Sequence, residues 1–333
     1  MDQTISADRI REAANVIDPV FLRTPQYECE PLSKRLGVTT LLKVESANPI
    51  RSFKGRGADY LMHVLADDAR RIVCASAGNF GQGMAYACRK RNKPITVFAA
   101  RSANPLKVER MKALGAHVEL TGDDFDQAKD AAKLHAQENG QLYIEDGKLA
   151  PIAEGAGTIA IELTDDTEHL DAIFVPLGNG ALVNGIGTWI KRHTPTTRVI
   201  AVCAQNAPSM ALSFEAKKAV TAPSSTIADG IAVRVPVPEA VGAMANTVDE
   251  VMLVTDDEML QSMRDLLDDA GLIVEPAGAA GVAAIQKRAQ ELANKRVAAM
   301  LTGGNLTAQQ IADWLTGAPG RRGGRARPGD PAR

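Results

Sequence analysis

Short apolar runs of the β type alternate along this chain with longer segments that have a helical pattern. The runs are Thr40–Val44, Arg71–Ala75, Ile95–Ala99, His117–Leu120, Ala172–Pro176, Val199–Ala204, Glu250–Val254 and Arg296–Leu301. Several are apolar throughout, which is typical of strands covered on both faces of a parallel sheet. Helical patterns lie between them, among them Gly81–Arg91, Pro105–Leu114, Asp124–Gln137 and Asp256–Ala270. This alternation predicts an open α/β fold.

Length and charge narrow the class of protein. A chain of 333 residues is long enough for two domains. The formal net charge is -2 and Lys and Arg are spread along the chain, so no nucleic-acid surface is predicted. No apolar run approaches the ~18 residues of a membrane span, and the first residues do not resemble a secretory signal. The four cysteines lie far apart, which is typical of reduced thiols, so we expect a cytoplasmic protein.

Three turns that follow predicted strands are candidate ligand sites, because ligands of open α/β sheets bind where strands end. Ser76–Gly83 is rich in small residues and leads into a helical pattern, so its backbone N–H groups are suited to an anion. Gly178–Leu182 has the same character and is suited to a phosphate. Thr302–Asn305 places a hydroxyl at the end of a buried strand, although a simple helix cap or tight turn explains it equally well.

The second turn lacks the signatures of two common phosphate ligands. A dinucleotide fingerprint requires a third glycine that is displaced here to Gly185, and an acid about 20 residues further on. The next strand ends at Cys203-Ala204-Gln205, without Asp or Glu. The Gly-Lys-Ser/Thr of a nucleotide-binding P-loop is also absent. The turn therefore predicts a phosphate that belongs to neither NAD nor ATP.

Lys54 is the candidate for covalent chemistry. Most lysines are solvated surface residues, but Lys54 lies between Phe53 and the small residues of Gly55-Arg-Gly-Ala58. A lysine in a desolvated pocket has a lowered pKa and can form a Schiff base.

The segments Ser52–Ala58, Ser76–Asn79 and Gly178–Leu182 together resemble the fold-type II pyridoxal-phosphate (PLP) enzymes, most closely the threonine/serine dehydratase and serine racemase family. Thr226–Val233 and Glu275–Gly278 are further matches, and the similarity extends from about Ile10 to Trp314. The resemblance implies a tryptophan synthase β-like fold with two open twisted-sheet domains and the cofactor in the cleft between them. We expect residues 1–66 and 147–316 in the large PLP-binding domain, 67–146 in the small domain, and 317–333, which consist mainly of Gly, Pro and Arg, as a disordered tail.

The resemblance also implies roles for individual residues. Lys54 forms the Schiff base with pyridoxal 5'-phosphate, Phe53 packs beside the cofactor, Asn79 hydrogen-bonds its 3-hydroxyl and Thr302 meets its ring nitrogen. The phosphate is held by Gly178, Asn179, Gly180, Ala181 and Leu182. The substrate carboxylate is bound by Ser76, Ala77, Gly78, Asn79 and Phe80. A homodimer is implied as well.

The reaction implied by the resemblance is β-elimination from a 3-hydroxy amino acid (threonine, serine or 3-hydroxyaspartate) to a 2-oxo acid and ammonia. An amino-acid racemase and a PLP-binding protein without turnover are the alternatives. Ala77 stands where serine racemases carry a second serine, which favours elimination. Cys203 and Ser209 stand where many relatives carry carboxylates for a divalent ion, so no metal is predicted there.

Arg51 replaces a small residue of the family pattern and has two interpretations. In the first, the side chain has no role in binding and points to solvent or pairs with an acid such as Glu45. In the second, it lines the cleft and binds an anionic side chain of the substrate.

Overall fold

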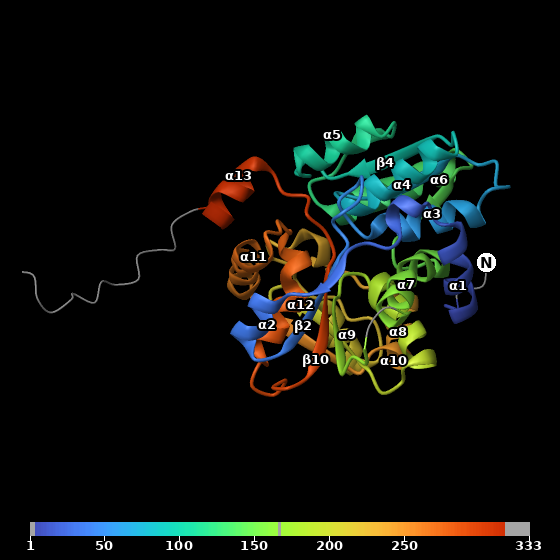
Figure 1. The fold of residues 1–333 in the computed structure, drawn as a ribbon. Helices are drawn as coiled ribbons and strands as arrows, with labels where there is room; N and C mark the ends of the chain where they lie inside the picture. The colour runs from blue at the N-terminus through green and yellow to red at the C-terminus, as the bar shows by residue number, and fades with distance from the viewer. Residues whose placement is uncertain (1–3, 166–167, 317–333) are drawn as a thin grey trace, which may run out of the picture.

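The computed structural model describes residues 4–165 and 168–316, which contain two β-sheets, each flanked by helices (Figure 1). The smaller sheet and its helices α4, α5 and α6 lie above the larger sheet in this view. Among the described residues, no helix is long and apolar enough to cross a membrane.

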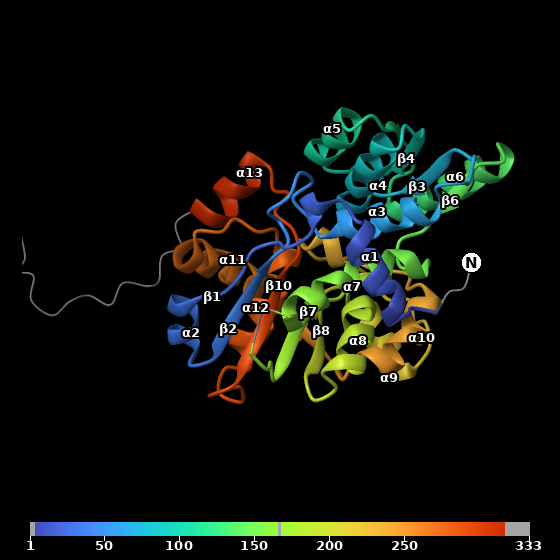
Figure 2. The same ribbon diagram turned by 45° about the vertical axis from the view of Figure 1, so that its right-hand side comes forward.

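The larger sheet has six strands in the order β1-β2-β10-β7-β8-β9, several of which are seen side by side in Figure 2. All neighbours are parallel except β1 and β2. The strands are β1 (Gln26–Glu28), β2 (Thr39–Val44), β7 (Ala172–Pro176), β8 (Arg198–Ala204), β9 (Glu250–Val254) and β10 (Arg296–Leu301). The central strands β7 and β10 are buried along almost their whole length, which explains their uniformly apolar sequences.

The smaller sheet has four parallel strands in the order β5-β4-β3-β6. They are β3 (Ile72–Ala75), β4 (Ile95–Ala99), β5 (His117–Leu120) and β6 (Leu142–Ile144). All four come from one continuous stretch of chain, whereas the larger sheet combines strands from before and after that stretch.

Helices connect the strands and cover both sheets. Those of the first half are α1 (Ala7–Val16), α2 (Glu30–Leu36), α3 (Lys54–Val64), α4 (Asn79–Lys90), α5 (Pro105–Ala113), α6 (Phe125–Glu138) and α7 (Ala150–Asp165), with the 3-10 turn η1 (Pro19–Phe21). Those of the second half are α8 (Ala181–His193), α9 (Ser209–Ala216), α10 (Pro238–Thr247), α11 (Asp256–Ala270), α12 (Pro276–Lys287) and α13 (Ala308–Ile311), with η2 (Asp229–Ile231) and η3 (Ala312–Thr316).

Helix α3 joins the two halves of the molecule, because it packs against both α4 and α7. Its sequence allows this close approach. A methyl group on Gly57 would collide with the backbone carbonyl oxygen of Ile152 in helix α7. Because Lys54 is the first residue of α3, this packing fixes its position between the two sheets.

All eight strands expected from the apolar runs are present, with bounds that differ by at most one residue, and the four expected helices are present as well. The sequence analysis missed β1 and β6, which have three residues each. The expected tail, 317–333, lies outside the described residues.

Candidate active site

One cavity of about 570 Å³ lies between the carboxyl ends of the strands of the two sheets. Its walls include the residues that follow β3, β6, β7 and β10, together with the start of α3. This is the position in which open α/β sheets bind ligands. Its size suits a small organic molecule together with a substrate.

Hydrogen bonds hold the backbone segment that carries Lys54 into this cavity. The backbone of the segment pairs with the turn after β10, since Phe53 N–H donates to Thr302 O at 3.1 Å and Gly304 N–H donates to Arg51 O at 3.0 Å. An isolated β-bridge between Ser52 and Gly303 lies between these bonds. The third turn of the sequence analysis and the lysine segment are therefore one structural unit.

The Nζ atom of Lys54 has a carboxylate and two aromatic rings around it. It donates to Oδ2 of Asp146 at 2.5 Å, and both side chains are mostly buried. The ring centroids of Phe53 and Phe80 lie 4.8 Å and 5.9 Å from Nζ. The lysine thus stands in an apolar pocket with a single acid as its direct partner.

The loop after β3 has the form of an anion site. Ser76 Oγ accepts hydrogen bonds from the N–H groups of Gly78 and Gly81, at 3.2 Å and 2.8 Å, which curls the loop around the start of α4. Gly78, the N-cap residue of α4, makes no side-chain cap, and Ser76 takes only the N–H of Gly81 in the first turn. The first N–H groups of this 12-residue helix favour a bound anion such as a carboxylate.

Asn79 is held in a network that joins the two sheets. Its Nδ2 donates to Oε1 of Glu275 at 2.5 Å, and its Oδ1 accepts from Nδ2 of Asn305 at 2.8 Å. Lys107, from α5, completes the network: its Nζ lies 2.6 Å from Asp229 Oδ2 and 3.7 Å from Glu275 Oε2. Burial opposes the charge of Lys107, but the carboxylates of Glu275 and Asp229 outweigh it and raise its pKa.

The turn after β7 forms a cradle at the N-terminus of α8. Gly180 has φ +95°, a left-handed conformation that glycine adopts without strain, and it stands directly before the first residue of the helix. Gly178 leaves no room for a side chain, because a Cβ atom there would lie 2.8 Å from Gly230 O. A phosphate group fits this cradle, where backbone N–H groups and the helix dipole favour its charge.

Most residues predicted for the site line the cavity. They are Phe53, Lys54, Ser76, Ala77, Gly78, Asn79, Phe80, Gly178, Asn179, Gly180, Leu182 and Thr302. Ala181 is not among the lining residues, because its side chain packs into the core around α4.

Arg51 also lies outside the cavity lining and is exposed. It does not pair with Glu45, whose oxygens accept from Thr24 and Arg56 instead. Its exposed position agrees with the solvent-facing alternative of the sequence analysis. Arg51 does not line the cavity that contains Lys54.

The sequence analysis missed several charged residues of the cavity, including Lys107 and Asp146, and it noted Asp229 and Glu275 only as parts of motifs. Asp146 follows the short strand β6, and the polar triplet Glu145-Asp146-Gly147 directly after an apolar strand was the available signal. Lys107 gave no signal, because a lysine on an amphipathic helix is an ordinary surface pattern.

Among the described residues, no group of three or more His, Cys, Asp or Glu is placed to hold a metal ion. Cys203 is buried in the core, and the Ser209 hydroxyl donates to Val233 O at 2.7 Å. That no divalent ion binds there stays a prediction.

Comparison with known proteins identifies the family. A family model described as "pyridoxal-phosphate dependent enzyme" matches residues 17–303. The chain belongs to this family. A lysine and a phosphate cradle in one cavity are the features that such a cofactor needs, so the residues present fit pyridoxal phosphate.

Individual members of the family resemble the chain over most of its length. The biosynthetic L-threonine dehydratase of Lactococcus lactis is 33% identical over 311 residues, which are 90% of this chain and 75% of that protein. An L-threonine ammonia-lyase of Thermotoga maritima is 33% identical over 310 residues, or 92% and 77% of the two chains.

Solved structures of the family share the fold. The processed form of threonine deaminase isoform 2 from Solanum lycopersicum superposes with a TM-score of 0.86 at 28% identity and covers 95% of each chain. Maize serine racemase has a TM-score of 0.87 at 27% identity, with 93% and 96% covered. The expected fold-type II architecture is confirmed.

Proposed function

We propose that this enzyme is an ammonia-lyase that converts a 3-hydroxy amino acid to a 2-oxo acid and ammonia by β-elimination. The substrates proposed are threonine, serine and 3-hydroxyaspartate. The observation that carries the proposal is the position of Lys54 Nζ in one cavity with the anion loop Ser76–Phe80 and the phosphate cradle Gly178–Gly180. The names of the threonine-cleaving relatives support it.

Each group of site residues has a separate role in the proposed reaction. The N-terminus of α4 binds the substrate carboxylate, which orients the Cα–H bond toward Lys54. The Lys54 amine is placed to take the Cα proton of the bound substrate. Bound pyridoxal phosphate supplies the electron sink for this proton loss. Phe53 and Phe80 keep water from the lysine.

Thr302 suits elimination because its hydroxyl carries no charge. An acid at that place would hold a proton on the cofactor ring nitrogen and strengthen the electron sink, whereas a neutral partner leaves a weaker one. We therefore assign Thr302 to the ring nitrogen and Asn79 to the 3-hydroxyl.

An amino-acid racemase is the second candidate, since maize serine racemase shares the fold at 27% identity. Racemisation requires a proton donor on the face opposite the lysine. In the loop that faces the substrate, Ala77 lines the cavity and has no proton to give. Elimination is therefore favoured over racemisation, and over cofactor binding without turnover. We further propose that the enzyme works in the cytoplasm, on the basis of its widely separated cysteines, and that it is a homodimer, on the basis of the family resemblance alone.

The decisive assay follows 2-oxo acid and ammonia from L-threonine, L-serine and 3-hydroxyaspartate with purified holoenzyme. The proposal expects equal amounts of 2-oxo acid and ammonia from at least one of them, with little D-serine formed from L-serine. Rapid D-serine formation without ammonia would support the racemase. An unchanged cofactor spectrum with all three amino acids, and no product, would indicate binding without turnover.

A further inference from the structure

Asp146 is a charged residue that directly contacts Lys54, and the elimination scheme above gives it no role. It follows β6, the strand that pairs with β3, so it reaches the cavity from the same sheet edge as the Ser76–Phe80 loop. Its Oδ2 accepts from Lys54 Nζ at 2.5 Å. Its Oδ1 is buried and has no hydrogen-bond partner. One oxygen therefore remains available beside the reactive lysine.

The backbone next to Asp146 packs closely against the phosphate cradle. Gly147 has φ +85°, and a Cβ there would lie 2.7 Å from Asn179 O in the phosphate cradle. The neighbouring Glu145 turns away to Lys129, with which it forms an ion pair. Asp146 is thus held between the lysine and the cradle.

The other ionisable groups near the pair are already neutralised or hold their protons. Lys107 pairs with Asp229 and Glu275. Burial raises the pKa of the Tyr143 hydroxyl and of the Cys74 thiol, so both stay protonated near neutral pH. Lys54 is consequently the cation with which Asp146 forms an ion pair.

We propose that Asp146 is the positioning residue that stabilises the protonated form of Lys54 during the reaction. This inference rests on the proposed function. The Lys54 lone pair forms an N–H bond with the Cα proton as the C–H bond breaks. The resulting ammonium forms a charge-assisted hydrogen bond with Asp146. It then returns the proton to the β-hydroxyl oxygen as the Cβ–O bond breaks, so water leaves and Lys54 is neutral again.

The proposal predicts the sign of two pH effects of Asp146→Asn, which keeps the shape and removes the charge. A nearby carboxylate favours the protonated nitrogen, so its removal favours the neutral form. The ascending limb of the kcat–pH profile, which requires neutral Lys54, moves to lower pH. The maximal kcat falls by about tenfold to a hundredfold, the value of one charge-assisted hydrogen bond.

The test uses the holoenzyme and an absorbance titration of the resting cofactor, which reports the protonation of the nitrogen of Lys54 without any turnover. Wild type, Asp146→Asn and Asp146→Glu are compared with Asp130→Asn, which removes an exposed carboxylate from α6. The expected result is a lower titration midpoint for Asp146→Asn, partial return in Asp146→Glu, and no change in Asp130→Asn.

An unchanged midpoint in Asp146→Asn that still binds cofactor would overturn the proposal, whatever the turnover. A shifted midpoint with unaltered kcat would also overturn it, because the stabilised ammonium would then play no part in the reaction. If wild type releases no ammonia from any of the three substrates but its midpoint depends on Asp146, the proposed function fails while the pairing of Asp146 with the cofactor lysine stands.

Discussion

Arg51 shows at the level of a single residue how two interpretations of one local pattern are weighed by the structure. Its place three residues before Lys54 suggested a contact with substrate. The chain turns at Arg51, which has φ +51°, and this turn directs the side chain to solvent while its carbonyl accepts from Gly304 N–H. Sequence spacing gives the distance along the chain, but it does not give the direction of a side chain at a turn.

The position of Arg51 yields a prediction on substrate choice. Arg51→Ala should change the ratio of kcat/KM for threonine to that for 3-hydroxyaspartate by no more than about twofold, as for a surface substitution. Arg70→Ala, on another exposed arginine, is the control. A selective loss of tenfold or more with 3-hydroxyaspartate would show that Arg51 binds the side-chain carboxylate after all.

At the level of elements, the apolar runs predicted the buried strands well and the short ones poorly. β7 and β10 are buried on both faces, so their residues had to be apolar. β1 (Gln26–Glu28) is a three-residue edge strand with a mostly polar sequence, and β6 (Leu142–Ile144) is too short to show a period. Neither carries enough buried surface to leave a pattern in the sequence.

The packing of α3 on α7 is predicted to depend on Gly57. Gly57→Ala places a methyl group against Ile152 O, which should destabilise the apoprotein by about 1–3 kcal/mol because the backbone cannot yield. Gly242→Ala, in α10, is the matched control: a Cβ there has nothing within 4 Å and should stabilise by ~0.5–1 kcal/mol. Thermal unfolding measures both. Equal Tm changes of the same sign would contradict this account of the helix contact.

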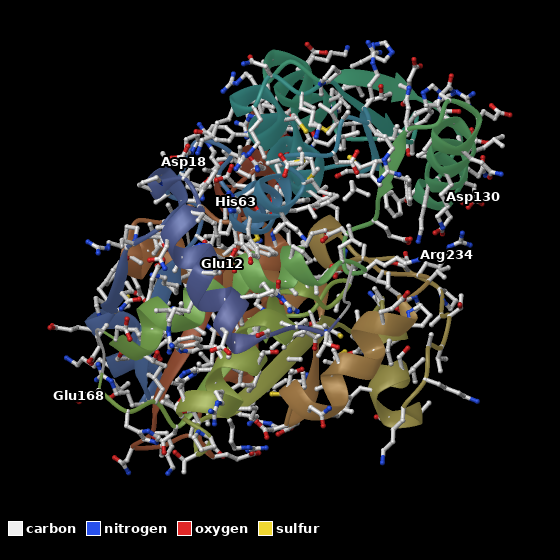
Figure 3. All side chains as sticks on the ribbon, turned by 90° about the vertical axis from the view of Figure 1, so that its right-hand side faces the viewer. Glu12, Asp18, His63, Asp130, Glu168 and Arg234 are labelled. Atoms are coloured by element: carbon white, nitrogen blue, oxygen red, sulfur yellow. The ribbon has the colours of Figure 1, made fainter. Side chains whose placement is uncertain are left out.

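At the level of the whole molecule, ion pairs of two kinds connect the two sheets across the cavity. The side chain of Lys107 is 3% exposed and pairs with Asp229, which is 55% exposed, and with the buried Glu275. Arg234 and Asp126 form a pair at the rim in which the cation is exposed, and Arg234 lies opposite helix α6, the helix that carries Asp130 (Figure 3). These partners are far apart in sequence, so only the folded chain brings them together.

The two ion pairs should respond differently to salt. Arg234→Ala should raise KM by less than about fivefold at 0.05 M NaCl, and the difference should vanish near 0.5 M, because exposed pairs are weak and screened. Lys107→Met leaves Glu275 buried without its cation and should lower kcat/KM by at least about tenfold at both concentrations. Steady-state kinetics at the two salt concentrations test this. An Arg234 effect that persists at high salt would contradict the assignment of that pair to the solvent-exposed rim.

The sequence predicted the family, the two-sheet architecture and the three turns that line part of the cavity, because glycine-rich turns and the Ser52-Phe53-Lys54 segment are local patterns. It did not foresee how the charges of the cavity are paired. Asp146 lies 92 positions from Lys54 in the chain, and its contact depends on the position of β6 beside β3. Such pairings follow from strand order, which no single segment encodes.

The identity of the cofactor lysine tests the central claim most directly. Holoenzyme is reduced with borohydride, which fixes pyridoxal phosphate to the lysine that carries it, and the labelled peptide is mapped by mass spectrometry. We predict that the label lies on Lys54, and that Lys54→Ala protein is not labelled under the same conditions. A label on another cavity lysine, such as Lys107 or Lys129, would contradict the account of this site.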